Sequence, residues 1–553
     1  MKKIFSLVLL FAATATAMAI PAKPGPIVRT AEDGTEKIIY LHGNEWFHYT
    51  TDEQGRWLDE TTLKPLTEAQ KKARLDEGVA AQTMRRAPQA KEEVGGKPNI
   101  SPRGLVILVS FSDKEFTTPK ATMDSMHNGR NFTRDYTFKY GFTKYHIQSS
   151  GSVWQYFHDQ SYGAYDPIFD VVGPITLDKE MEYYGKNYGS WTDKNATDMI
   201  KEACIAADTI YNIDFAQYDN DNDGFVDFVY IIYAGNGEAD SGIENTVWPH
   251  QWNLYTIGGI NCQIDGKRID RYACGNEISY LSNQHDGIGT FCHEFSHVLG
   301  LPDFYETNNP AKGIHTLGEW DIMDRGCYNN DGNTPPAYSS YERFYMGWLT
   351  PRVLGRAEKL SIGKLNADTT ALLMCEGDSH NLIGYNPNPT TFYMVENREK
   401  TGWDKYLPGK GLLITKITYN ANTWLNNAVN NKSNAMGVDI IEAKPVSGSN
   451  NAPAYNTSFN GKTSQTTEDD GKGSYTDAYP AGSEHFTAFP GHELKWIELG
   501  KDGIIRGKYR WDETPVENVQ SDDVQCTKVL KDGQVIIVRG GVSYDMMGRK
   551  IDR

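Results

Sequence analysis

The residues best placed to do chemistry are two histidines and a glutamate in the stretch Phe291–Asp303, FCHEFSHVLGLPD. His293 and His297 are four positions apart, so on an α-helix of 3.6 residues per turn they lie on one face, one above the other. Two imidazoles so placed can bind one Zn²⁺ through their Nε2 atoms at about 2.0–2.1 Å. Glu294 follows the first histidine, which puts its carboxylate beside the metal. There it can serve as the general base towards a metal-activated water and pass the proton to a leaving amine.

The chain must then turn back if a third ligand is to reach the same metal. Gly300 permits this turn, because a positive φ costs glycine little. Pro302 stiffens the turn, and Asp303 is placed to supply an oxygen ligand. The alternative is a buried amphipathic helix with two incidental histidines, since a short His-Glu-x-x-His stretch also occurs by chance. The glycine and the aspartate at fixed distances favour the metal site.

A second group of acidic residues, DNDNDGFVD at 219–227, directly precedes an apolar stretch. Carboxylates at alternate positions followed by a glycine are how a loop surrounds Ca²⁺ with oxygen ligands. The glutamate that completes an EF-hand is missing, so a polar surface turn is the alternative. Four mutually repelling carboxylates favour calcium. The expected ligands are four side chains and one backbone carbonyl: Asp219, Asp221, Asp223 and Asp227, with the carbonyl of Phe225.

Two residues beyond the metal motif are candidates for supporting roles. Met323 lies in the polar turn Trp320–Gly326, 26 residues after His297, and could form a hydrophobic floor beneath the metal. An ordinary buried methionine is the alternative. Tyr328 follows five residues later, and its phenol could stabilise an oxyanion, which makes it a candidate catalytic residue.

The first 19 residues have the pattern of a secretory signal peptide. Met1–Lys3 is positively charged, Ile4–Ala13 is apolar, and Ala17-Met-Ala19 is an A-x-A cleavage site. The apolar run is too short to span a membrane, and no later run approaches the roughly 20 apolar residues of a transmembrane helix. We therefore expect processing after Ala19, no transmembrane segment, and a secreted protein that is extracellular or at the cell surface.

Composition limits the partners of this 553-residue chain. It carries 55 Lys and Arg against 72 Asp and Glu, a formal net charge of −17. No basic stretch offsets this charge, so we expect no nucleic-acid partner. Seven cysteines are an odd number and too few for a disulfide framework. Cys262 and Cys274 flank a hairpin-like stretch and could bond to each other.

The elements around the metal motif predict an α/β sheet domain, which we place at residues 101–350. Arg103–Phe111 and Phe225–Ala234 are runs of branched apolar residues, typical of buried strands. Strands that alternate with helices indicate the α/β class. Helices are expected over residues 152–157, 196–207, 286–299 (the metal helix) and 338–348.

Residues 20–100 form a separate N-terminal segment. Thr67–Leu75 has a helical pattern, with Gly78 after its end. Ala81–Pro102 lacks apolar periodicity and is rich in Ala, Gln, Lys, Pro and Gly, as exposed linkers are. A segment that precedes the metal motif and is joined to it by such a linker suggests a propeptide. A small accessory domain that stays attached is the alternative.

Arg85 and Arg86, within this linker, are the candidate processing site. Residues 20–100 contain no cysteine, so no thiolate of this segment can block the metal. Latency would come from steric cover or from a carboxylate that reaches the metal, and the candidates for that carboxylate are Asp52, Glu53 and Asp59.

Residues 351–510 predict an antiparallel, β-rich domain. Short apolar runs recur between Gly-, Asn-, Pro- and Ser-containing loops: Leu360–Ile362, Thr369–Leu373, Phe392–Val395, Gly411–Thr415 and Val438–Ile441. Asn450–Ser474 is polar, which predicts a long flexible loop. Residues 511–553 form a C-terminal tail with a small hairpin over Gln534–Tyr544.

Taken together, these motifs resemble those of the M6 (immune inhibitor A-like) family of secreted zinc metallopeptidases. The resemblance covers most of residues 20–445. It rests on Ala22–Pro26, Arg103–Phe111, the 219–227 loop with Val229–Gly235, Trp248-Pro-His250, the metal motif, the Met323 turn, Tyr345–Trp348, Glu396–Arg398 and Pro408-Gly409.

The resemblance implies a metzincin-like catalytic domain, with a mixed twisted sheet and an active-site helix. It implies His293, His297 and Asp303 as zinc ligands and Glu294 as general base. Many metzincins have a histidine where this chain has Asp303. The tail Gly533–Arg549 resembles short C-terminal segments of exported bacterial proteins and could act in sorting.

The predicted function is that of a secreted zinc endopeptidase, a monomeric zymogen that acts on protein or peptide substrates and carries structural calcium. The alternative is an inactive relative that binds protein or glycan through the β-rich region. Glu294 beside an intact ligand set separates the two, because a binding module does not need it. A zinc amidase or esterase would use the same activation of water.

Overall fold

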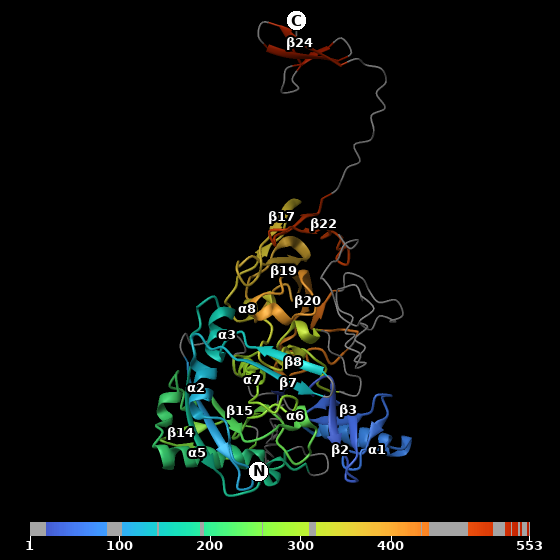
Figure 1. Cartoon of the computed structure of the whole chain (residues 1–553). Coiled ribbons are helices and arrows are strands. Elements are labelled where there is room, and N and C mark those ends of the chain that lie inside the picture. Colours follow the sequence, from blue (N-terminus) through green and yellow to red (C-terminus); the bar gives the residue numbers. More distant parts are fainter. Residues whose placement is uncertain are drawn as a thin grey trace, which may run out of the picture. The chain divides into compact units, whose positions relative to one another are not determined.

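The computed structural model describes residues 18–85, 102–140, 143–187, 193–256, 258–308, 317–432, 434–441 and 485–511, and short strands between 526 and 551. It divides into two compact units, Met1–Tyr509 and Arg510–Arg553. The first unit is mixed α/β, with helices among several sheets (Figure 1), as predicted. None of the described helices combines the length and the apolar character needed to span a bilayer.

A six-stranded sheet lies at the centre of the region that carries the metal motif. Four parallel neighbours, β15, β11, β6 and β9, are extended at one side by the antiparallel strands β12 and β1. The strands in sheet order are Met18–Ala19 (β1), His250–Asn253 (β12), Arg271–Asn276 (β15), Val229–Tyr233 (β11), Arg103–Ser110 (β6) and Ile168–Thr176 (β9).

Both buried strands predicted from apolar runs are present, with one difference. The run 225–234 is divided, because Phe225–Val226 (β10) pairs with Lys267–Ile269 (β14) in a separate three-stranded sheet. Only the second half of the run continues as β11 in the central sheet. Gln263–Ile264 (β13) completes the smaller sheet.

The metal helix is Gly289–Val298 (α7), and it packs against β12, β15 and α3. Phe291 and Phe295, four positions apart, share one face and contact the rings of Phe169 and Phe228. The histidines are displaced from these phenylalanines by two residues, or about 200° around the helix. Burial of the aromatic face therefore turns both histidines away from the sheet.

The helices predicted over 152–157, 196–207 and 338–348 are present. The helix predicted over 338–348 begins with a capping box, in which the Ser339 side chain accepts from the Glu342 N–H and Glu342 accepts from the Ser339 N–H. That helix is Ser340–Tyr345 (α8). The α-helices Val153–Gln160 (α3) and Ala196–Tyr211 (α5) were also predicted, whereas four others were not: Lys120–Asn128 (α2), Met181–Gly185 (α4), Glu238–Ser241 (α6) and Ala421–Leu425 (α9).

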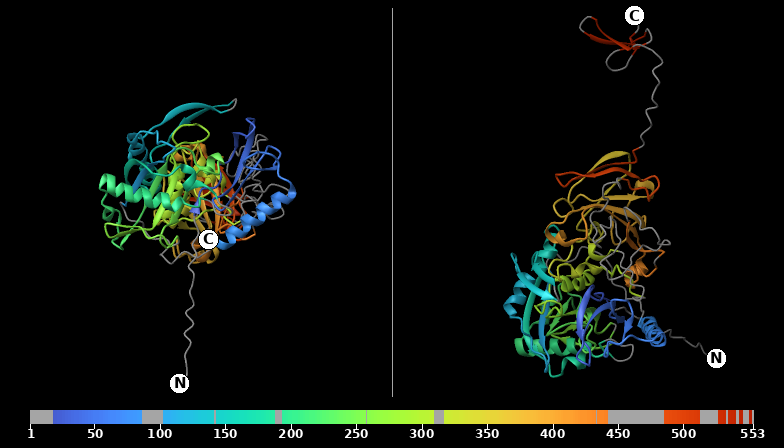
Figure 2. Two further views of the ribbon diagram at one scale, coloured as in Figure 1. Left: turned by 90° about the horizontal axis from the view of Figure 1, so that it is seen from below. Right: turned by 45° about the vertical axis from the view of Figure 1, so that its right-hand side comes forward.

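The N-terminal segment folds as an antiparallel sheet with one helix, shown in blue in Figures 1 and 2. It lies beside the region that carries the metal motif, residues 102–350, which is called the catalytic region below. The helix α1 spans Glu68–Arg85, longer than predicted. Gly78 does not end the helix but lies within it. A Cβ at this position would lie 2.1 Å from the Phe47 ring, so the position requires glycine. This glycine lets the helix approach the sheet closely. The strands are Pro26–Thr30 (β2), Glu36–Asn44 (β3), Phe47–Thr51 (β4) and Trp57–Leu58 (β5).

The predicted linker therefore begins later than expected. Residues 81–85 are helical, and Arg85 is the last residue of α1. Arg86 and the rest of the linker up to residue 101 lie outside the described residues. A hairpin of Asp135–Tyr140 (β7) and Thr143–Gln148 (β8) contacts the N-terminal sheet, where the Tyr140 hydroxyl accepts from the Val28 N–H.

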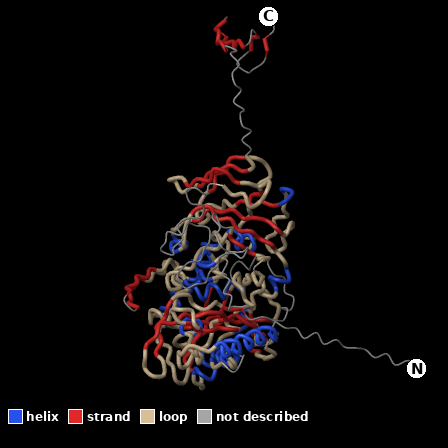
Figure 3. The backbone as a smooth tube through the Cα atoms, turned by 90° about the vertical axis from the view of Figure 1, so that its right-hand side faces the viewer, coloured by secondary structure: helices blue, strands red, loops and turns tan. Residues whose placement is uncertain are grey.

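Residues 351–509 are rich in strands, red in Figure 3, as predicted. One sheet has the order β16-β18-β19-β20-β21 and the other β17-β23-β22; only the β16–β18 pair is parallel. The strands are Arg352–Val353 (β16), Glu358–Ile362 (β17), Leu372–Cys375 (β18), Thr391–Arg398 (β19), Gly411–Thr418 (β20), Val438–Ile440 (β21), Leu494–Leu499 (β22) and Ile505–Tyr509 (β23).

The five-stranded sheet shares a hydrophobic core with the catalytic region, because one cluster includes Ile417 and Val438 together with residues of α7 and β6. The three-stranded sheet packs on the same five-stranded sheet in a second cluster. The predicted loop 450–474 lies outside the described residues. The second unit is a four-stranded antiparallel sheet that contains the predicted hairpin: Cys526–Lys531 (β24), Gln534–Arg539 (β25), Val542–Tyr544 (β26) and Lys550–Ile551 (β27).

The expected Cys262–Cys274 disulfide is wrong, since both cysteines are free and buried. Cys274 lies within the central strand β15, where its Sγ is 3.4 Å from His250 Nδ1. Cys262 precedes β13 of the smaller sheet. The hairpin between them therefore leads from the edge of the smaller sheet to the central sheet, and the two sulfurs are not bonded.

Candidate active site

The structure brings His293, His297 and Asp303 together in a buried cluster. The Nε2 atoms of His293 and His297 are 3.2 Å apart. Asp303 Oδ1 lies 3.2 Å from His293 Nε2 and 3.4 Å from His297 Nε2. A tetrahedral ion with bonds of about 2.0–2.1 Å separates its ligand atoms by about 3.3–3.4 Å. The three atoms therefore fit three corners of a zinc site.

Second contacts orient both imidazoles for this role. His293 Nδ1 lies 2.6 Å from the Ile322 carbonyl, and His297 Nδ1 lies 2.7 Å from the Leu301 carbonyl. A carbonyl can only accept, so each Nδ1 carries the proton and each Nε2 presents a lone pair to the cluster. Met323, the predicted floor residue, is buried directly after Ile322, so the predicted turn supplies one of these contacts.

Asp303 is brought back to the histidines by the predicted glycine turn. Gly300 has φ +101°, the left-handed region that favours glycine. Asn427, between α9 and β21, then holds the aspartate: its Oδ1 accepts from the Asp303 N–H at 2.7 Å and its Nδ2 donates to Asp303 Oδ2 at 2.6 Å. Asn427 could not be predicted from the sequence, since no spacing relates it to a motif 124 residues earlier.

Two buried oxygens at the cluster are left without a hydrogen-bond donor, Asp303 Oδ1 and Glu294 Oε2. A buried carboxylate oxygen without a donor is costly unless a cation or a reacting group meets it. Burial would raise the pKa of Asp303, but the two histidines hold it well below its usual range. Burial raises the pKa of Glu294, and the Asp303 and Glu45 carboxylates add to this. These donors suit a divalent cation.

Residues Ala19–Lys23 pass directly over this cluster. Met18–Ala19 (β1) pairs antiparallel with the edge strand β12, with Ala19 opposite His250. The Ile20 N–H donates to Glu294 Oε1 at 3.0 Å, and Trp248 Nε1–H donates to the Ile20 carbonyl at 3.0 Å. The chain's own N-terminal residues therefore fill the space in front of the candidate base.

Two tyrosine hydroxyls also bind this segment. Tyr305 donates to the Ala19 carbonyl, and Tyr328 donates to the Pro21 carbonyl at 2.7 Å. The predicted Tyr328 is therefore at the cleft, but two residues away from the peptide group that faces Glu294. Tyr305 was missed, although its position two residues after Asp303 is a signal that could have identified it.

The carboxylates considered for blocking the metal have other partners. Asp52 forms an ion pair with Arg56 at 2.7 Å, and Asp59 accepts from the Thr62 N–H at 2.7 Å. Glu53 is exposed. The backbone of Ala19–Lys23 occupies the cleft instead, and an ion pair between His48 and Glu238 at 3.0 Å ties the N-terminal sheet to α6.

The acidic loop is only partly assembled as predicted. Asp219, Asp221 and Asp223 place carboxylate oxygens within 4.8 Å of one another. Asp227 turns away and accepts from the backbone N–H and side chain of Asn220, and Lys267 Nζ lies 2.6 Å from Asp219 Oδ2. Phe225, the expected carbonyl ligand, donates its N–H to Asp223 Oδ1 at 2.8 Å.

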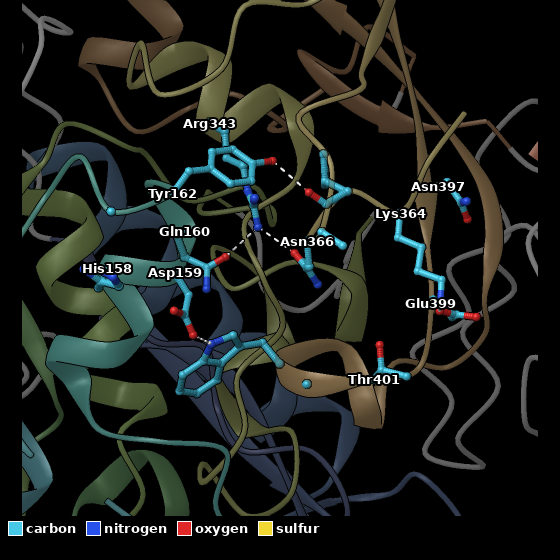
Figure 4. Close-up of a pocket in the computed structure, with 15 residues that line it drawn as sticks. His158, Asp159, Gln160, Tyr162, Arg343, Lys364, Asn366, Asn397, Glu399 and Thr401 are labelled. Carbon is cyan, nitrogen blue, oxygen red and sulfur yellow. Dashed lines mark hydrogen bonds and ion pairs between the residues drawn. The ribbon is translucent and has the colours of Figure 1, made fainter. Parts of the chain in front are cut away.

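A separate pocket of about 460 Å³ lies between α3, α8 and the β-rich region (Figure 4). The Arg343 guanidinium donates to Gln160 Oε1 at 2.8 Å and to Asn366 Oδ1 at 2.7 Å. Tyr162 donates to the Leu365 carbonyl at 2.8 Å. These hydrogen bonds join α3 and α8 to residues 365–366, although Arg343 Nη1 and Gln160 Nε2 have no hydrogen-bond partner among the described residues. The pocket therefore lies at a junction between the two regions.

Comparison with known proteins agrees with the geometry. Residues 91–350 match the family model described as immune inhibitor A peptidase M6, catalytic domain. The pre-pro-metalloprotease PrtV of Vibrio cholerae serotype O1 is 29% identical over 281 residues, which are 46% of this chain and 27% of that protein. Immune inhibitor A of Bacillus thuringiensis subsp. alesti is 27% identical over 265 residues, 42% of this chain and 38% of that protein. The chain thus spans well under half the length of these relatives, and its residues 91–350 match the peptidase M6 family of metallopeptidases.

Proposed function

We propose that this protein is a secreted zinc-dependent endopeptidase with a metzincin-like catalytic domain. The observation that carries the proposal is the buried His293–His297–Asp303 cluster at tetrahedral ligand spacing, with the Glu294 carboxylate beside it. The experiment is hydrolysis of casein by the processed protein, compared with the same preparation carrying Glu294→Ala. Equal hydrolysis by the two would overturn the proposal.

In this mechanism the bound zinc supplies Lewis acidity, which activates a water molecule and polarises the substrate carbonyl. Glu294 takes the proton of the attacking water and delivers it to the leaving amine. Its Oε1 already accepts a hydrogen bond from a backbone N–H, the group to which this proton is delivered. The Tyr305 hydroxyl, which binds the preceding carbonyl, donates to the oxygen on which negative charge develops. Asn427 keeps Asp303 in place.

The N-terminal segment acts in this proposal as a propeptide that covers the cleft. Its backbone lies at Glu294, and before signal-peptide removal the preceding residues Met18 and Ala19 pair with the edge strand β12 as an added strand. A substrate that pairs with the same edge competes with it directly. Latency therefore needs no carboxylate on the metal, only a peptide that stays in place while its sheet remains attached.

We predict that blocking the processing site preserves latency. Residues 20–553 with Arg85→Ala and Arg86→Ala should stay intact and show at least about tenfold lower activity than the trimmed protein, because the tethered segment is present at a high effective concentration. Activity is followed over time on a small peptide and on casein. Equal activity of uncut and trimmed protein on both substrates would favour the accessory-domain interpretation.

We also propose that the 219–227 loop binds structural calcium. A ligand that binds only the folded state stabilises it by mass action, so saturating Ca²⁺ should raise the melting temperature by about 2–5 °C. The double variant Asp219→Ala, Asp221→Ala should lose this shift and keep its zinc. If Ca²⁺ raises the melting temperature of wild type and variant equally, the loop is not the calcium site.

A further inference from the structure

Residues Ala19–Lys23 lie in the cleft in the register of a substrate. An endopeptidase's general base must reach the amide nitrogen of the bond it cleaves, to which it returns a proton. Glu294 reaches the nitrogen of Ile20, and Tyr305 binds the carbonyl on the other side of the same peptide bond. In the chain before signal-peptide removal, the Ala19–Ile20 bond therefore occupies the place of a scissile bond, and Lys23 is the fourth residue after it.

The Lys23 side chain ends in a buried group of acids. Its Nζ lies 2.6 Å from Asp331 Oδ1 and 3.3 Å from Ser279 Oγ, and only 7% of the residue is exposed. Asp240 and Asp286 add negative charge around the ammonium group. Burial lowers the pKa of Lys23, but Asp331, Asp240 and Asp286 outweigh this and raise it above its usual value.

Two features of this recess favour a bound cation. Asp240 is 5% exposed, and its Oδ1 has no hydrogen-bond partner. Asp331 is held in the left-handed region at φ 53°, a conformation that costs a non-glycine residue energy. The nearby cation of the catalytic region, Arg134, donates to the Asp286 carbonyl and to Asn333, so it compensates only part of the charge of three carboxylates.

The groups that surround the Lys23 ammonium among the described residues come from the catalytic region. Asp240 lies in α6, Ser279 follows β15, Asp286 precedes α7, and Asp331 follows Tyr328. The backbone N–H of Lys23 is also bound by this region, through the Ala239 carbonyl at 2.8 Å. The recess therefore stays with the catalytic region when the N-terminal segment leaves.

We propose that Asp240, Asp286 and Asp331 form a substrate subsite that binds a lysine or arginine side chain at the fourth position after the cleaved bond. The chain's own Lys23 fills it before processing. This subsite deepens the proposed peptidase function and rests on it for the register of the substrate. A cationic side chain satisfies the buried carboxylates, whereas an uncharged one leaves them unpaired and a glutamate is repelled.

The test uses the processed full chain and peptides based on residues 17–26, AMAIPAKPGP, with Lys, Arg, Met or Glu at the fourth position after the Ala-Ile bond. We expect kcat/KM for Lys and Arg to exceed that for Met by about 10–100-fold and that for Glu by more. In Asp331→Asn the preference should fall to within about threefold. Asparagine tolerates the left-handed backbone at this position, and Asp178→Asn, an exposed change of the same charge, is the matched control.

Equal kcat/KM for Lys, Met and Glu in the wild type would overturn the subsite, and this comparison needs no variant. If no peptide is cleaved, the proposed function fails, and the unprocessed full chain decides the subsite separately. There Lys23→Met should lower the melting temperature and Lys23→Arg should retain it. Melting temperatures that are the same for Met, Arg and wild type would show that the recess does not recognise a cation.

Discussion

Glu294→Ala should abolish hydrolysis of casein and of peptides while leaving the metal bound. The carboxylate contributes no atom to the cluster of His293, His297 and Asp303, so its removal spares the ligands. Loss of a general base typically costs about 10²–10⁴-fold in rate, and more when the same group also positions the attacking water. The measurement is kcat/KM together with zinc content by elemental analysis.

Glu182→Ala is a suitable control for this substitution, because Glu182 lies on the surface in an ion pair with Lys186. It should leave both quantities unchanged. Near-normal turnover of the Glu294 variant would rule out the assigned base. Loss of zinc from that variant would instead mean that Glu294 holds the metal.

The second large effect is expected for Tyr305→Phe. Removing one hydrogen-bond donor to a developing oxyanion typically costs about 10²–10³-fold in kcat. Since the aromatic ring is retained, the buried packing of this residue is preserved. We therefore expect kcat to fall while KM changes by less than about threefold.

Tyr328→Phe is the matched comparison, because this hydroxyl also binds the N-terminal segment but two residues further on. It should raise KM more than it lowers kcat. If Tyr328→Phe loses kcat and Tyr305→Phe does not, the original assignment of Tyr328 as the oxyanion donor is right and the role given to Tyr305 is wrong.

The sequence predicts the metal cluster well because its geometry is local. A separation of four residues on a helix and a glycine turn place His293, His297 and Asp303 through backbone geometry alone. The aromatic pair Phe291 and Phe295 packs against the sheet, and this turns the histidine face of the helix towards the metal cluster. No long-range information is needed for these features.

The groups that complete the site come from distant parts of the chain and could not be predicted in this way. Asn427 binds Asp303 from the β-rich region, and Ile20 reaches Glu294 across 274 positions. Such contacts depend on how separate elements pack, which hydrophobic periodicity does not record.

Two predicted element boundaries differ from the structure for the same reason. Gly78 was read as the end of a helix, yet it permits close packing of α1 on Phe47. The apolar run at 225–234 was read as one strand, but β10 and β11 join different sheets. In both cases the residue types fit two structures, and tertiary contacts select between them.

The central claim, peptide hydrolysis that depends on the cluster of His293, His297 and Asp303, is tested most directly by a chelation experiment on the processed protein. Casein hydrolysis is measured before chelation, after chelation and dialysis, and after addition of one equivalent of Zn²⁺. We expect activity to disappear and then to return with zinc, in proportion to the zinc bound. Hydrolysis that persists in the fully chelated protein would contradict the account.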